Sequence, residues 1–235
     1  FGYAPPPMTG FRSINAIPPG HLLTWTENKV VQTQYWKLDS SQKTIFQIPD
    51  AISQTKEILE ESVKLRLISE RPIGVLLSGG IDSTLVAAYA AKNLSSKLNT
   101  FSIGFEDPQF DESGYASQVA RRLGTEHHQL IVKPDPELLV RTMAKTLDRP
   151  FADSSILPTF IVSEFARSQV VVALGGDGGD EAFGGYSRYQ LVDRMQSLNP
   201  LFRVARPLSP VLRRLALQTH DQRIARLAGG LRTYG

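Results

Sequence analysis

The chain has 235 residues, a formal net charge of +3, 41% hydrophobic residues and no cysteine. This composition is that of a globular protein with its own core, and it excludes disulfides, cysteine–zinc sites and a thiol nucleophile within the chain. The longest apolar runs, such as residues 170–174, are much too short to cross a membrane, and the opening FGYAPPPMTG does not resemble a signal peptide. We therefore expect a cytoplasmic protein with no membrane partner.

Residues 1–49 are rich in proline and in residues that favour β-structure. The runs HLLTW and VVQTQYW flank the polar TENK, which predicts a β-hairpin. We interpret this region as the end of a β-rich unit, followed by a linker near residues 39–49. Because the chain does not begin with Met, we expect it to start inside a longer protein.

From residue 50 onward, the pattern is an alternation of helices and strands. Ile52, Leu59, Val63 and Leu67 recur at helical spacing, and Asp50 is the predicted N-cap of that helix. The next expected elements are a strand at 73–77, a helix at 82–93, a strand at 99–105, a helix at 112–123, a strand at 127–132, helices at 136–147 and 157–167, and a strand at 169–174. Apolar strands between amphipathic helices predict an α/β fold: a three-layer parallel sheet with helices on both faces.

The stretch GVLLSGGIDST, residues 74–84, places an apolar strand directly before two glycines and an acid. Open parallel sheets bind ligands at the carboxyl ends of their strands, and glycines let the backbone approach an anion closely. The following helix directs free N–H groups at the same point, and Ser78, Ser83 and Thr84 add hydroxyls, so the stretch predicts a phosphate-binding loop.

The acid in this loop predicts a metal ion. The lysine of the common nucleotide-binding loop is absent, and Asp82 stands where it would repel phosphates unless a cation such as Mg²⁺ lies between them. The alternative is a plain strand-to-helix turn in which Asp82 is the N-cap.

A second glycine-rich stretch, GGDGGDEAFGGY at residues 175–186, follows the last predicted strand. Its acids Asp177, Asp180 and Glu181 predict oxygen ligands for a hard cation, and a flexible surface loop is the alternative. If the two strands are neighbours, Asp82 and Asp180 could both bind Mg²⁺ that bridges the phosphates of a nucleotide.

Together, these motifs resemble the synthetase domain of the glutamine-dependent asparagine synthetases, which are N-type ATP pyrophosphatases. The segments PPGH with a downstream YW, LLSGGIDST, FSIGFEDPQFDES, GTEHH, RPFADSSILPT and LGGDGGDEAFGGY are similar to that family in order and spacing. The resemblance implies an adenine nucleotide alpha hydrolase-like fold at residues 50–235, incomplete at its C-terminus. It also implies that residues 1–49 are the β-rich C-terminal remnant of an N-terminal nucleophile glutaminase domain, plus a linker.

In that family the β-carboxylate of aspartate attacks the α-phosphate of ATP, and ammonia then displaces AMP from the β-aspartyl adenylate. The resemblance thus implies ATP and Mg²⁺ as cofactors. Its small-molecule partners would be ATP, aspartate and ammonia released from glutamine by the glutaminase domain of the full-length chain. A homodimer is among the expected assemblies, and activity is expected of the complete protein rather than of this piece.

The resemblance also assigns roles to individual residues. Asp177 would handle the intermediate or a proton of the incoming ammonia, at a position where some members carry Glu. The pyrophosphate and Mg²⁺ would be bound by Ser78, Gly79, Gly80, Asp82 and Ser83, the second Mg²⁺ ligand would be Asp180, and the adenosine would be bordered by Leu77, Ile103, Gly175 and Gly176. Residues Asp153, Ser154 and Ser155 would help to form the substrate side.

Other charged residues are expected to be structural. Asp111 and Glu112 are interpreted as acids at the start of a helix, and His127 and His128 as strand residues. The arginines at 203–232 are interpreted as a solvated helix face, with contact to a partner or to an acidic or phosphorylated ligand as the alternative. No basic stripe is interleaved with aromatic residues, so no nucleic-acid partner is expected.

Two other functions remain open at this point. The first is a sibling amide-forming ligase, similar to a β-lactam synthetase or to a glycan or secondary-metabolite amidotransferase. The second is an ATP-binding module without turnover, although paired metal-binding acids are not needed for binding alone.

Overall fold

The computed structural model describes residues 2–39, 46–109, 111–133, 135–148, 151–153, 155–190, 192 and 210. The chain divides into two compact units, Phe1–Gly176 and Asp177–Gly235, which we describe separately. Several residues from the sequence predictions lie outside the described residues: part of the predicted linker (40–45), Ser154, and the arginines Arg203, Arg206, Arg213, Arg214, Arg223, Arg226 and Arg232.

The first unit begins with the predicted hairpin, which is confirmed. Strands β1 (His21–Thr26) and β2 (Lys29–Gln34) pair antiparallel, with Thr26 opposite Lys29. Only Glu27 and Asn28 form the turn, with φ of 45° and 63°. Two successive residues at positive φ are typical of a type I′ turn, whose twist matches the right-handed twist of the two strands that it joins.

The main sheet has the predicted parallel arrangement. Strands β3 (Ile73–Leu76), β4 (Asn99–Phe105), β5 (Glu126–Val132) and β6 (Val172–Leu174) are ordered β5-β4-β3-β6, and each neighbouring pair is parallel. The last strand begins three residues later than predicted. The N–H groups of Gln169 and Val170 both donate to the carbonyl oxygen of Ala166, so these two residues complete the end of the preceding helix instead.

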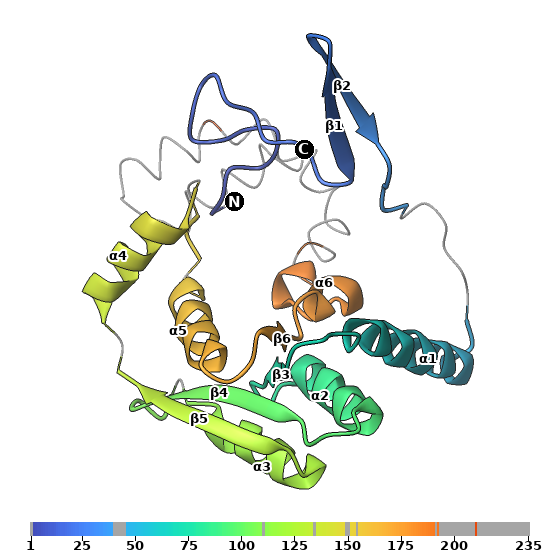
Figure 1. Cartoon of the computed structure of the whole chain (residues 1–235), viewed down its shortest axis with the longest axis vertical. Coiled ribbons are helices and arrows are strands. Elements are labelled where there is room, and N and C mark those ends of the chain that lie inside the picture. Colours follow the sequence, from blue (N-terminus) through green and yellow to red (C-terminus); the bar gives the residue numbers. More distant parts are fainter. Residues whose placement is uncertain are drawn as a thin grey trace. The chain divides into compact units, whose positions relative to one another are not determined.

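Five helices of the first unit were predicted at nearly their observed bounds: α1 (Ile48–Arg66), α2 (Ile81–Asn93), α3 (Ser113–Leu123), α4 (Pro136–Thr146) and α5 (Ile156–Arg167). In Figure 1, α3 and α5 lie on opposite sides of β4 and β5. Within the described residues, no helix is both long and apolar enough to span a bilayer.

Two hydrophobic clusters show that helices cover both faces of the sheet. On one face, Val75 and Leu77 pack with small residues of α2 and α3, namely Ala87, Ala90, Ala116 and Ala120. On the other face, Leu76 and Phe101 pack with α5 through Val162, Phe165 and Ala166. Because neighbouring strand residues point to opposite faces, the run from Val75 to Leu77 serves both clusters. The predicted three-layer α/β fold is confirmed.

The first helix corrects two predictions. Asp50 is not the N-cap: α1 starts at Ile48, Gln47 occupies the cap position, and Pro49 lies in the first turn, where a missing N–H costs nothing. Asp50 lies in the same turn, where its charge favours the helix dipole. Of the predicted apolar face, Val63 is buried, but Ile52 is 50% exposed.

The two adjacent histidines are confirmed as strand residues, and each is bound to β4. His127 contacts Thr100 Oγ1 through Nδ1 at 2.9 Å and Ser102 Oγ through Nε2 at 3.2 Å. His128 contacts Asn99 Oδ1 at 3.0 Å and stacks on the ring of Phe101. These contacts link the edge strand β5 to the centre of the sheet on both faces.

Acidification should weaken the fold through His127. Burial, together with the neighbouring His128, lowers the pKa of His127 below its ordinary value of 6.5. The unfolded chain therefore binds more protons than the folded chain as pH falls below 6.5, so the free energy of unfolding decreases in that window. His127→Gln should flatten this decrease, as measured by urea unfolding at a series of pH values. Equal slopes in the two proteins would contradict the role.

Candidate functional site

The first glycine-rich loop lies where predicted, between a buried strand and a helix. Leu77 is 1% exposed, and its N–H donates to the carbonyl oxygen of Phe101 at 2.8 Å. Ser78, Gly79 and Gly80 then form the turn, and α2 begins at Ile81. Gly79 has φ of +85°, a conformation that glycine adopts without a steric penalty. Gly80, not Asp82, occupies the N-cap position.

Hydrogen bonds inside the loop fix its shape. The hydroxyls of Ser78 and Ser83 lie 2.9 Å apart, and Ser83 Oγ also donates to the Gly80 carbonyl and accepts from the Ser78 N–H, both at 3.3 Å. Ser83 is only 6% exposed, whereas Ser78 and Gly80 are exposed. Ser83 therefore holds the turn together from inside, and Ser78 and Gly80 present it to solvent.

Thr84 differs from its prediction. The sequence offered its hydroxyl as a further phosphate donor, but Thr84 Oγ1 is closed off from solvent and has no hydrogen-bond partner among the described residues. Its position in the first turn of α2 turns this side chain into the protein, so Thr84 contributes no accessible donor at the loop.

The second glycine-rich stretch reaches the first loop at Gly176. Strand β6 pairs with β3, with Leu174 opposite Val75, so both strands end at the same edge of the sheet. A Cβ atom on Gly176 would lie 2.7 Å from the backbone nitrogen of Ser83 and 3.0 Å from Asp82 Cβ. Gly176 is therefore pressed against the start of α2, and the structure brings these residues of the predicted site together.

Gly175 and Ile103, two of the residues predicted to border the adenosine, lie next to these loops, after β6 and in β4 respectively. Gly175 is half-buried and joins β6 to Gly176. Ile103, also half-buried, lies in β4 two residues after Phe101, whose carbonyl binds Leu77, and pairs with Leu130 of β5.

The second unit carries the other predicted acids. Asp177 is exposed, and Asp180 lies in the short helix α6 (Gly179–Phe183). A Cβ atom on Gly185 would collide with Asp180 Oδ1, so a larger residue at this position would require the carboxylate to move. The sequence predicted no helix here because glycine disfavours helices. The proximity of Asp82 to Asp180 stays a prediction.

Glu181 is engaged by a residue that sequence reasoning missed. The Tyr186 hydroxyl donates to Glu181 Oε1 at 2.9 Å, which raises the pKa of Tyr186, and the Arg188 guanidinium lies 4.1 Å from the centre of the Tyr186 ring. The motif places a tyrosine five residues after the glutamate, but that spacing alone does not predict the bond. Glu181 is thus already bound within the protein.

The side chains at this loop fit a metal ion that takes some of its ligands from a bound nucleotide. Within the described residues, no three side chains of histidine, cysteine, aspartate or glutamate gather as they would in an all-protein metal cage. Asp82 is half-buried and lies in the first turn of α2, directly after the Ser78–Gly80 turn. Mg²⁺ commonly binds one or two carboxylates and takes its remaining ligands from water and substrate phosphates, so the loop is consistent with a magnesium–nucleotide ligand.

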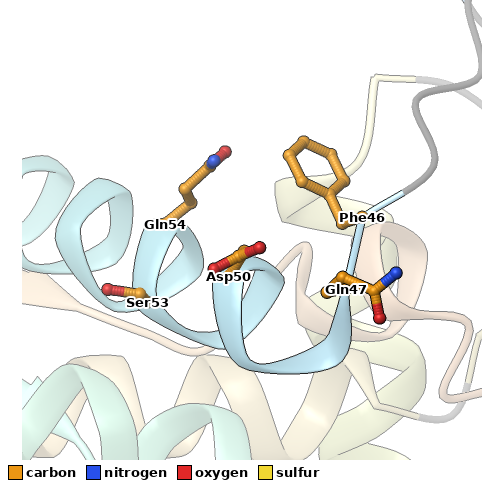
Figure 2. Close-up of a pocket in the computed structure, with 5 residues that line it drawn as sticks. All are labelled: Phe46, Gln47, Asp50, Ser53 and Gln54. Carbon is orange, nitrogen blue, oxygen red and sulfur yellow. The ribbon is translucent and has the colours of Figure 1, made fainter.

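A separate hollow of about 390 Å³ lies at the start of α1 (Figure 2). It is lined by Phe46, Gln47, Asp50, Ser53 and Gln54. All five residues come from one short segment, so no second element supplies a converging polar group. This hollow does not coincide with the predicted site.

Comparison with known proteins gives one consistent result. The model of the asparagine synthase family matches residues 54–233. Putative asparagine synthetase [glutamine-hydrolyzing] 2 of Methanocaldococcus jannaschii is 37% identical over 204 residues, which cover 85% of this chain and 39% of that protein. Asparagine synthetase [glutamine-hydrolyzing] 1 of Bacillus subtilis is 30% identical over 219 residues, which cover 92% of this chain and 34% of that protein.

A fungal relative has a different name. Amidase chyE of Penicillium rubens is 29% identical over 204 residues, which cover 77% of this chain and 30% of that protein. The chain thus spans less than two fifths of the length of each of these relatives.

Proposed function

The chain belongs to the asparagine synthase family, and from this premise we propose that it is the ATP-binding part of an enzyme that makes asparagine from aspartate. The observation that carries the proposal is the contact between Gly176 and the Asp82–Ser83 backbone. It supports a single nucleotide site built from two glycine-lined strand ends, as expected for an open parallel sheet.

In the proposed reaction, the β-carboxylate of aspartate attacks the α-phosphorus of ATP, and the bond from that phosphorus to the bridging oxygen breaks. Pyrophosphate leaves, and β-aspartyl-AMP remains. Ammonia then attacks the activated carbonyl, AMP leaves with the bonding electrons, and a proton is lost from nitrogen. The exposed Asp177 would handle the intermediate or accept that proton.

The loop residues would hold the pyrophosphate. Ser78, Gly79 and Gly80 would bind phosphate oxygens, with the Gly80 N–H exchanging its 3.3 Å bond to Ser78 Oγ for a bond to phosphate. Ser83 would keep the turn in shape. Asp82 and Asp180 would hold Mg²⁺, which supplies positive charge to the leaving pyrophosphate when bound. Leu77, Ile103, Gly175 and Gly176 would border the adenosine.

The proposed domain organisation follows the same relationship. Residues 1–49, with the β1–β2 hairpin, would be the C-terminal part of a glutaminase domain and a linker, and residues 50–235 would belong to the synthetase domain. The family match beginning at residue 54 supports this division. The glutaminase domain of the complete protein would supply ammonia from glutamine, and a cytoplasmic homodimer is part of the proposal.

Exchange between ATP and labelled pyrophosphate tests the proposed first step. In the complete protein, pyrophosphate should enter ATP only when aspartate is present, because reversal requires the β-aspartyl adenylate. Exchange that is indifferent to aspartate would contradict asparagine synthesis. If the protein binds ATP but shows no exchange with any carboxylic acid tested as substrate, it would be a non-catalytic ATP-binding module.

A second candidate function is a sibling amide-forming ligase. The observation that favours a function other than asparagine synthesis is a fungal relative, matching over 77% of this chain, that is named an amidase and not an asparagine synthetase. Exchange that is supported by a different carboxylic acid, and not by aspartate, would select this alternative. The two candidates share the nucleotide site and differ in the acid that they activate.

A further inference from the structure

We infer that Asp111 is a positioning residue for ATP binding, which sets the Ser78–Gly80 loop through the first turn of α3. The inference rests on the proposed function, because it takes this loop as the phosphate site. Asp111 is not part of the loop, and the sequence assigned it only a role at the start of a helix.

Asp111 ties the end of β4 to the start of α3. Its Oδ1 atom accepts the N–H of Ser113 at 3.1 Å and the N–H of Phe105 at 3.4 Å. A further bond from the Ser113 side chain helps to lower the pKa of Asp111. One carboxylate oxygen therefore fixes the helix start relative to the strand end. Glu112, at the N-cap position, makes no side-chain capping bond.

The neighbouring glycine makes room for this arrangement. A Cβ atom on Gly104 would lie 2.8 Å from Asp111 Oδ1 and 2.9 Å from Ser113 Oγ. The carboxylate thus lies directly over the backbone of β4, in a space that a larger residue would fill. Ser113 is 5% exposed, so the bonded group lies at the edge of the core.

The turn held by Asp111 is the one against which the phosphate loop packs. A Cβ atom on Gly79 would lie 2.7 Å from both the Ala116 nitrogen and Tyr115 Cβ. Ala116 is fully buried and belongs to the hydrophobic cluster on this face of the sheet. Gly79 therefore rests on the backbone of α3, and a shift of Tyr115 and Ala116 would shift the loop.

The matched comparison is Asp135, which makes the same kind of bonds at another helix. Its Oδ1 accepts the N–H groups of Glu137 and Leu138 at 2.9 and 3.2 Å at the start of α4. Asp111→Ala and Asp135→Ala each remove two hydrogen bonds from backbone N–H groups, and Asp111→Ala also removes the bond from the Ser113 side chain. Only the Asp111 substitution loosens the turn that contacts Gly79.

The test measures ATP binding with Mg²⁺ by titration calorimetry, and thermal unfolding, in the complete protein and its variants. Asp111→Ala should weaken ATP binding about tenfold, as is usual when a residue that orients binding groups is lost. Asp135→Ala should lower the unfolding temperature without changing ATP binding. Asp111→Asn keeps an oxygen acceptor and should restore binding to within about threefold of wild type.

The remaining outcomes also either support or overturn the inference about Asp111. Unchanged ATP binding in Asp111→Ala, or an equal loss in Asp135→Ala, would overturn the inference. If Asp111→Ala does not fold, Gly104→Ala decides, because its added methyl would displace the Asp111 carboxylate. Weaker ATP binding in that folded variant supports the inference, and unchanged binding overturns it. Wild-type protein that binds ATP but shows no aspartate-dependent exchange would remove asparagine synthesis and leave the inference standing. Wild-type protein that binds no ATP would overturn both.

Discussion

Asp82→Asn is expected to lower aspartate-dependent ATP–pyrophosphate exchange by about two to three orders of magnitude, the range found when one charge-stabilising group is removed from an active site. Asp82 is the only acid in the loop at residues 74–84. Asparagine has nearly the same size but no charge to balance a cation beside the phosphates, so the loop should keep its shape. The measurement is exchange in the complete protein at saturating ATP and Mg²⁺.

Asp50→Asn is the matched control for this substitution. Asp50 and Asp82 both lie in the first turn of a helix, α1 and α2 respectively. Both variants lose a similar favourable contact with the helix dipole, so their unfolding temperatures should fall by similar small amounts. Only Asp82→Asn should lose exchange. Full exchange in Asp82→Asn would remove Asp82 from the proposed metal site.

Gly176→Ala should abolish tight ATP binding and destabilise the fold by about 2 kcal/mol, a typical cost of forcing an atom into a packed site. The added methyl would lie 2.7 Å from the Ser83 nitrogen and 3.0 Å from the Asp82 carbonyl carbon. Both are backbone atoms, so no side-chain rotation can relieve the contact. The end of β6 and the start of α2 would have to separate at the proposed nucleotide site.

Gly114→Ala provides the opposite expectation. A Cβ atom on Gly114 meets nothing within 4 Å, and the residue lies in α3. Alanine should therefore stabilise the helix by about 0.5 kcal/mol, since it loses less backbone freedom than glycine on folding. Urea unfolding and ATP titration of both variants check the pair. Gly176→Ala with wild-type stability and affinity would show that the two strand ends do not form a tight site.

The alternation of apolar strands and amphipathic helices predicted the three-layer fold because each element must bury one face or both. Prediction was weakest at element ends. Asp50 resembled an N-cap, but Pro49 is accommodated in the first turn of α1, and the helix starts earlier. Residues 169–170 resembled a strand, but their N–H groups bond to the helix before them. Local hydrogen bonds determine where an element begins and ends, and the spacing of apolar residues carries no information about these bonds.

The position of the glycine-rich loop was predicted better than the place of each side chain in it. The serines, glycines and Asp82 indicated a phosphate loop from residue type alone. Only the structure separates the exposed Ser78 from the buried Ser83. It also shows that Thr84 Oγ1 is buried, although its sequence position matches that of a donor. The direction of a side chain on a helix start depends on what packs against that helix, and this is not written in the motif.

The amino-acid sequence by itself determined the α/β class, the order of the elements and the family, because patterns of residue type and local spacing carry all three. The tertiary structure decided that β6 lies beside β3, which brings Gly176 against Asp82 and Ser83, and that α3 supports Gly79. The contact of Gly176 with Asp82 and Ser83 joins residues about a hundred positions apart in the sequence. The contact of Gly79 with α3 joins residues more than thirty positions apart. They depend on strand order and on close packing of backbones, which a single sequence does not specify.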